Sequence, residues 1–252
     1  MEELRLLSLA TSDFALLRLR NQIYIDKSAL VYKVASRNGK FLFVRPRRFG
    51  KSLLISTFES LFKFGLRDFK GLAIEELWQE KKTYNVVRLD FSESRTDFGL
   101  EKFKEDLKDR LIDNFSRFGF RYDQAGFSIF NQLSAWLKKQ ESNSLVLLID
   151  EYDTPLTSCL NDPELFSSIQ DALSDFYAVL KSNDDALRFV FITGIINFKE
   201  ARIFSELQEL NDISLDSEFG ELLGFTRSEL EEYFYLYLES ASRALNWPAS
   251  EL

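Results

Sequence analysis

Short apolar runs alternate along the chain with longer segments whose apolar residues recur at a helical period. The runs are KFLFV at 40–44, YNVVRLDF at 84–91, SLVLLI at 144–149 and LRFVFI at 187–192. Runs that are hydrophobic on both faces are typical of strands buried between two layers of helices. Each run is therefore predicted to be a strand.

The segments between these runs predict helices. In 100–118, Phe103, Leu107, Leu111 and Phe115 recur every four residues, which places them on one face of an amphipathic helix. Further helices are predicted at 27–36, 52–64, 127–140 and 164–181. The alternation of strands and helices predicts an α/β fold, a three-layer sandwich around a mostly parallel sheet.

The pattern is less regular towards the two ends of the chain. Ser12 is expected to cap a helix at 15–20, and 23–25 is a candidate for a short strand. Beyond residue 203 the pattern is helical, and Thr226 with Glu229 predicts a capping box that starts a helix reaching about residue 245.

Three parts are expected along the chain. They are an N-terminal helix and strand segment at 1–38 packed on a ligand site, a core at 39–200, and a helical extension at 201–252. No closing element follows in 247–252. This ending fits a fragment cut before a lid or a further domain, and it fits a frayed natural terminus nearly as well.

The amino-acid composition excludes several kinds of site. Cys159 is the only cysteine and the chain has no histidine, which excludes an intrachain disulfide, a cysteine zinc site and histidine-based catalysis. Acid–base chemistry falls to carboxylates, lysine or tyrosine. A net charge of -8 disfavours nonspecific nucleic-acid binding. No run approaches a membrane span and no signal peptide is recognisable, so a cytoplasmic location without membrane contact is expected.

Residues 45–52 read RPRRFGKS and lie between a predicted strand and a predicted helix. A P-loop has the pattern Gly, four residues, Gly-Lys-Ser or Gly-Lys-Thr in that same setting. Arg45 stands where the first glycine is expected. Because arginine disfavours the positive φ that glycine permits, the front of this loop is expected to follow another path.

The rest of the motif has the groups that bind a triphosphate. Backbone amides at the helix start attract phosphate, Lys51 is long enough to reach the β and γ phosphates, and the Ser52 hydroxyl is a ligand for Mg²⁺. The residues expected to contact the nucleotide here are Arg47, Arg48, Phe49, Gly50, Lys51, Ser52 and Leu53. A Gly-Lys-Ser helix start without any ligand is the alternative, and the tripeptide alone does not exclude it.

A second motif follows the strand at 144–149, where the apolar run ends in Asp150-Glu151. The carboxyl end of a strand is where open α/β sheets bind ligands. Asp150 is predicted to hold Mg²⁺ opposite Ser52, and Glu151 to orient and deprotonate the attacking water. Adjacent strand residues face opposite sides, so both act together only if the strand ends there. Together the two motifs predict a site for ATP or ADP with Mg²⁺.

Other residues at the same predicted edge have more than one interpretation. Thr193, after the strand at 187–192, is a candidate for contact with the γ-phosphate or the water, with Asn197 as a second candidate. A turn or cap role for Thr193 is an equal alternative. Asp90 ends another strand, where a structural role is favoured over contact with Mg²⁺ through water.

These motifs resemble the bacterial AAA-ATPase-like family over nearly the whole chain. The matching segments are YIDK at 24–27, RPRRFGKS at 45–52, LDFS at 89–92, LIDEYD at 148–153, TGI at 193–195 and LNDISL at 210–215. The RPRRFGKS block is specific to that family, so Arg45 is a family trait. Where the family has Ser-Lys after Thr-Gly-Ile, this chain has Ile196 and Asn197.

The resemblance implies ATP as the nucleotide, with Tyr24, Asp26 and Lys27 near the base or ribose. Members often carry a restriction-endonuclease-like nuclease domain at the C-terminus, so a C-terminal effector domain is an expected partner. Nucleic acid would then be an indirect partner, and a homo-oligomer is an open expectation.

Three functions fit these observations. The first is ATP hydrolysis coupled to an effector, and the second is a nucleotide-responsive switch with little or no turnover. The third is a degenerate domain for protein contacts or DNA handling, against which the acidic charge and the intact Lys51, Asp150 and Glu151 weigh. A nucleoside or sugar kinase is a weaker enzyme alternative, since no acceptor-site motif is recognisable.

Overall fold

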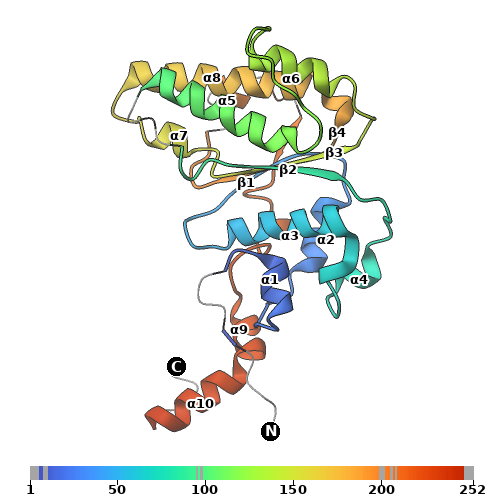
Figure 1. Ribbon diagram of the computed structural model, residues 1–252. Coiled ribbons are helices and arrows are strands. Elements are labelled where there is room, and N and C mark those ends of the chain that lie inside the picture. Colours follow the sequence, from blue (N-terminus) through green and yellow to red (C-terminus); the bar gives the residue numbers. More distant parts are fainter. Residues whose placement is uncertain are drawn as a thin grey trace.

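A computed structural model describes residues 6–7, 11–94, 96, 99–198, 202–204, 207 and 209–246. Within these residues, the strands form one five-stranded parallel sheet in the order β2-β3-β4-β1-β5. The strands are β1 (Gly39–Val44), β2 (Asn85–Asp90), β3 (Leu145–Asp150), β4 (Leu187–Gly194) and β5 (Leu210–Asp212). Helices cover both faces of the sheet (Figure 1), which confirms the predicted three-layer α/β sandwich.

One layer contains the N-terminal helices. It is made of α1 (Phe14–Leu19), α2 (Ser28–Ala35), α3 (Lys51–Phe64) and α4 (Ile74–Leu77). Phe58 of α3 packs against Phe189 and Phe191 of β4, with ring centroids 5.2 and 4.7 Å apart. This aromatic contact holds α3 against β4. Because only a short loop separates β1 from α3, the start of α3 lies at the carboxyl edge of the sheet.

The opposite layer covers the other face of the sheet. Its helices are α5 (Leu100–Ser116), α6 (Ile129–Leu137), α7 (Thr154–Thr157) and α8 (Pro163–Ser182). The predicted stripe from Phe103 to Phe115 is buried on α5. Short 3-10 helices lie at η1 (Gly65–Asp68), η2 (Asp184–Ala186), η3 (Arg202–Phe204) and η4 (Ser217–Phe219). No helix within the described ranges combines the length and apolar character that crossing a membrane requires.

The register aligns the strand ends that carry the predicted motifs. Asp90 of β2 is level with Asp150 of β3, and Val44 of β1 is level with Gly194 of β4. Because all these strands are parallel, their carboxyl ends meet at one edge of the sheet. The two predicted motifs, after β1 and after β3, therefore lie at the same edge with β4 between them.

Several local predictions were wrong. Residues 23–25 are not a strand, and Asp13 rather than Ser12 caps α1 by accepting the Leu16 N–H at 2.9 Å. The segment expected to be entirely helical contains β5, so a core ending at residue 200 leaves out one strand of the sheet. Three residues are too few to show a strand period.

The predicted C-terminal helix starts as expected but is interrupted. Thr226 and Glu229 form the capping box at the start of α9 (Arg227–Tyr233). Phe234, with φ -110° and ψ 8°, then separates α9 from α10 (Tyr235–Leu245). Both helices lie away from the sheet, and α10 extends furthest from it in Figure 1.

Candidate functional site

The loop between β1 and α3 takes the other path that Arg45 requires. Positive φ angles occur at Arg48 (67°) and Gly50 (91°). Arg48 is a non-glycine residue in the left-handed region, a conformation that costs energy and persists only where its surroundings hold it. Gly50 adopts its angle without a side-chain penalty and leads directly into α3.

Arg45 is fixed by contacts on the sheet side of this loop. Its guanidinium donates to the carbonyls of Val44 at 2.9 Å and Ser214 at 2.6 Å, and it lies 4.2 Å from the centroid of the Phe43 ring. Arg45 therefore ties the start of the loop to the segment that follows β5.

Lys51 is buried, with 6% of its surface exposed, at the first position of α3. Its ammonium donates to the Pro46 carbonyl at 3.0 Å, across the loop. Burial lowers the pKa of Lys51, whereas Glu151, Asp150 and Asp153 oppose that shift. The carboxylates at the end of β3 therefore favour the charged form of this lysine.

Asp150 is the last residue of β3 and is 1% exposed. Burial raises its pKa with help from Asp90 and Glu151, while the Ser52 hydroxyl and Arg88 lower it. Among the described residues, its Oδ1 has no hydrogen-bond partner. A buried acceptor without a partner is costly unless a ligand uses it, so Asp150 and Ser52 fit the oxygen ligands that Mg²⁺ prefers.

Magnesium at a nucleotide site needs few protein ligands, because phosphates and waters complete its shell. In the part of the chain that the structure describes, no group of three or more acidic or cysteine side chains forms a metal cluster. That finding is compatible with a site built from Ser52, Asp150 and the phosphates of a nucleotide.

Glu151 leaves the strand at once. Its φ of 52° starts the turn after β3, so Asp150 and Glu151 are both available at the sheet edge. The Thr154 hydroxyl donates to Glu151 Oε2 at 3.2 Å. Sequence interpretation gave no role to Asp153, yet it is buried in the turn that follows Glu151. The repeated acids at 150, 151 and 153 were the available signal.

The remaining candidates at this edge have partners within the protein. The Thr193 hydroxyl donates to the Phe43 carbonyl of β1 at 2.7 Å. Asn197 donates to Asp212 Oδ2 at 2.7 Å, and Asp90 Oδ1 accepts the Ser92 N–H at 2.9 Å. Asn197 thus lies nearer to β5, whereas Asp90 lies next to Asp150 across the sheet.

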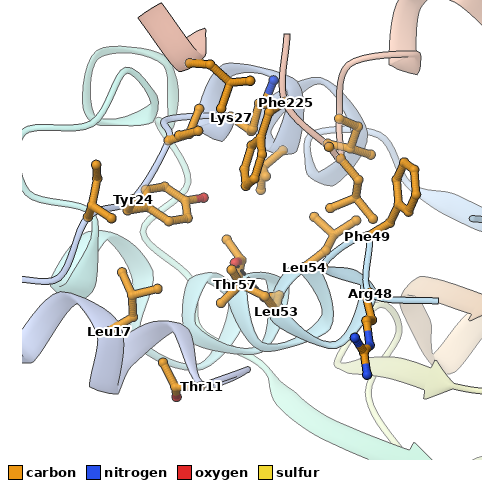
Figure 2. A pocket seen from close by; sticks show the side chains of 18 of the residues that line it. Thr11, Leu17, Tyr24, Lys27, Arg48, Phe49, Leu53, Leu54, Thr57 and Phe225 are labelled. Atoms are coloured by element: carbon orange, nitrogen blue, oxygen red, sulfur yellow. Dashed lines mark hydrogen bonds between the residues drawn. The ribbon is translucent and has the colours of Figure 1, made fainter. Parts of the chain in front are cut away.

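A cavity of about 760 Å³ lies against both the loop and α3. Figure 2 shows Tyr24, Leu53, Thr57 and Phe225 around it, contributed by the N-terminal segment, α3 and the segment before α9. Burial raises the pKa of Tyr24 above its ordinary range. Asp26 contributes structure, since its two carboxylate oxygens accept the N–H groups of Ser28 and Ala73, each at 2.8 Å.

Two contacts join the N-terminal side of the cavity to α9. Lys27 forms an ion pair with Glu229, and the Asp26 N–H donates to the Tyr233 hydroxyl at 3.3 Å. Sequence interpretation missed this junction, because residues 202 positions apart show no common local pattern.

The model of the AAA-ATPase-like family, whose members are described as predicted AAA-ATPases, matches residues 8–204. The chain belongs to this family. The resemblance noted from the sequence is thereby confirmed over most of the chain. The parallel sheet with helices on both faces agrees with the predicted P-loop NTPase sandwich.

Known proteins resemble the chain to different degrees. An uncharacterized protein in the vnfD 5′ region of Azotobacter chroococcum is 30% identical over 216 residues, which is 84% of this chain and 41% of that protein. The chain therefore spans about two-fifths of this relative. The Aeropyrum pernix Orc1 protein in complex with DNA has a TM-score of 0.42 at 14% identity, over 85% of this chain and 48% of that one. Cdc6p from Pyrobaculum aerophilum has a TM-score of 0.38 at 14% identity, over 85% and 46%.

Proposed function

We propose that the domain binds ATP with Mg²⁺ at the carboxyl edge of the sheet and hydrolyses it. The observation that carries this proposal is that the start of α3, with Lys51 and Ser52, and the end of β3, with the buried Asp150, lie at the same edge of the sheet with only β4 between them. The Ser52 hydroxyl beside Asp150 supports it further.

Each group has a role that follows from its position. The amides from Arg48 to Ser52 hold the phosphates, and Lys51 exchanges its bond to Pro46 for the β and γ oxygens. Ser52 and Asp150 would hold Mg²⁺, which would neutralise charge on the phosphate oxygens. Glu151 takes a proton from the attacking water.

The base is proposed to occupy the cavity beside α3. Tyr24 offers an aromatic face and Leu53 an apolar one, both suited to a planar ring. Arg48, Phe49 and Gly50 line the same cavity, so a nucleotide with its base there keeps its phosphates at the loop. Asp26 contributes by fixing the segment that carries Tyr24.

Two variants test the proposal. Lys51→Ala is expected to weaken ATP binding about 10- to 100-fold, because a charge-assisted hydrogen bond contributes about 1.5–3 kcal/mol. Glu151→Gln is expected to bind ATP like the wild type while phosphate release falls about 100-fold or more. Binding is measured by isothermal titration and turnover by phosphate release.

Lys63→Ala is the matched control, because Lys63 lies in the last turn of the same helix and pairs with Glu59. It is expected to leave ATP binding unchanged. Equal affinity in wild type and Lys51→Ala would remove the nucleotide site, and equal turnover in Glu151→Gln would remove that residue from the chemistry.

A nucleotide switch with slow turnover is the second candidate. It is favoured by the junction of Lys27 and Asp26 with α9, which gives the cavity a direct connection to the C-terminal helices. In this case nucleotide state sets the position of α9 and of an attached C-terminal effector. Tight ATP binding without phosphate release, even at high protein concentration, would favour the switch over the ATPase.

A further inference from the structure

The turn after β3 carries two buried polar side chains that the proposed chemistry leaves without a role. Tyr152 and Asp153 are almost fully buried although neither lies in a strand. Asp153 occupies the N-cap position of α7, yet its side chain does not cap that helix. Both side chains reach instead to the segment that follows β4.

Four hydrogen bonds connect these two side chains to loop 195–198. Asp153 Oδ2 accepts the N–H groups of Ile195 at 3.0 Å and Ile196 at 2.8 Å. The Tyr152 hydroxyl accepts the Phe198 N–H at 2.9 Å and donates to the Ile196 carbonyl at 2.8 Å. Since these bonds satisfy three of the four backbone N–H groups of the loop and one of its carbonyls, they hold it against the end of β3. We call this pair the Tyr152–Asp153 clamp.

The clamp leaves no room for a side chain at Gly194. A Cβ added at residue 194 would overlap Asp153 Oδ1 and would lie 2.8 Å from the Tyr152 ring, which is closer than real Cβ atoms approach other atoms. The glycine of TGI therefore allows the close approach of these two side chains. A larger residue would push the loop away from β3.

The clamped loop lies between the two motifs of the site. The Gly194 carbonyl accepts the N–H of Arg45 at 3.2 Å, where the phosphate-binding loop starts. Asn197 donates to Asp212 at the end of β5. The clamp thus connects the end of β3 with the strand ends on either side of the P-loop.

Only Oδ2 of the Asp153 carboxylate bonds to the loop. Among the described residues, Asp153 Oδ1 is buried without a hydrogen-bond partner, and such an acceptor lowers stability. The loop therefore needs one acceptor oxygen at this position, which an asparagine also supplies.

We propose that Tyr152 and Asp153 are positioning residues for ATP hydrolysis, which hold loop 195–198 in place beside Asp150 and the P-loop. The role rests on the proposed function. It predicts that loss of the clamp slows the chemical step while ATP still binds, because the P-loop and α3 are not part of the clamp.

Three variants of the full chain test this role. Asp153→Ala removes both acceptor bonds and is expected to lower kcat about 10- to 100-fold with the ATP Kd within about threefold of wild type. Asp153→Asn keeps the shape of the side chain and one acceptor oxygen, and it is expected to retain kcat within about threefold. Tyr152→Phe removes two hydrogen bonds and, like Asp153→Ala, is expected to lower kcat.

Asp162→Ala is the matched control, because Asp162 also accepts a backbone N–H, that of Leu165 at 3.0 Å at the start of α8. It is expected to leave kcat unchanged. Wild-type kcat in Asp153→Ala would overturn the role, as would equal losses in Asp153→Asn and Asp153→Ala, or a loss of ATP binding as large as that of kcat. If circular dichroism shows Asp153→Ala unfolded, Tyr152→Phe is judged by the same kcat and Kd criteria.

The result also separates this role from the proposed function. A wild type that binds ATP through Lys51 but releases no phosphate would remove the ATPase and the positioning role together. An active wild type with an equally active Asp153→Ala would remove only the positioning role.

Discussion

The ion pair between Lys27 and Glu229 is expected to set how fast a nucleotide leaves the cavity. Lys27 lines one side of the cavity, and Leu230 and Phe234, which follow Glu229 in and after α9, line the other. The paired side chains are 11% and 20% exposed, so water screens them only in part. Opening the cavity on the α9 side therefore breaks this pair.

The size of the effect follows from that partial burial. Exposed ion pairs contribute about 0.2–1 kcal/mol, whereas removing one partner of a buried pair costs about 3–5 kcal/mol. The Lys27–Glu229 pair lies between these limits, so we expect about 1–3 kcal/mol. That free energy corresponds to roughly a 5- to 150-fold faster opening when the pair is removed.

Two substitutions isolate the ion pair from the rest of α9. Glu229→Gln removes the charge but keeps a side chain that completes the capping box with Thr226. Lys27→Met removes the other charge and keeps an apolar stem of similar length. The rate of release of a fluorescent ATP analogue, measured by stopped flow, is expected to rise in each. The double variant is expected to release it no faster than the faster single variant.

Thr226→Ala controls for helix stability. It removes the cap hydroxyl that accepts the Glu229 N–H at 3.2 Å but leaves the ion pair in place. It is expected to change release less than Glu229→Gln does. Unchanged release in both single charge variants, or effects that simply add in the double variant, would refute the coupling, because groups that do not interact contribute independently.

Two further predictions concern stability. Phe58→Ala is expected to lower the free energy of unfolding by about 3–5 kcal/mol, measured by denaturant titration, because it leaves a cavity between α3 and β4. Asp150→Asn is expected to abolish phosphate release but to raise the midpoint of thermal unfolding at pH 7. Burial raises the pKa of Asp150, so the folded chain binds that proton more tightly and loses stability as pH rises from the ordinary value of 3.8 through the raised one. Asparagine removes this cost, and an unchanged or lower midpoint would contradict the explanation.

The parts of the fold that were predictable are those whose sequence pattern is local. The runs at 40–44, 144–149 and 187–192 form buried strands, because burial on both faces requires a mostly apolar sequence. The stripe on α5 was equally clear. By contrast, β5 has only the residues Leu210 to Asp212, and its place beside β1 depends on tertiary pairing that no local pattern records.

The same distinction applies to the candidate site. Lys51 and Ser52 were predicted from a motif with fixed spacing at the start of a helix, and Asp150 and Glu151 from the acidic end of an apolar run. The contact of Lys27 with Glu229 has no such spacing, and it becomes visible only when the N-terminal segment and α9 are packed together. Hydrogen bonds such as that from the Thr193 hydroxyl to the Phe43 carbonyl likewise depend on how the strands pack together.

Arg45 connects the unusual P-loop to the strand that the sequence did not reveal. A glycine at its position would allow a positive φ but would leave the end of β1 without a side-chain anchor. Arg45 instead binds the carbonyl of Ser214, just beyond β5, and lies over Phe43, while the positive φ angles move to Arg48 and Gly50. Because the Ser214 hydroxyl in turn accepts the Val44 N–H at 3.0 Å, the loop and β5 stabilise each other. An arginine at this position and a strand beside β1 therefore depend on each other, which explains how the loop keeps its shape without its first glycine.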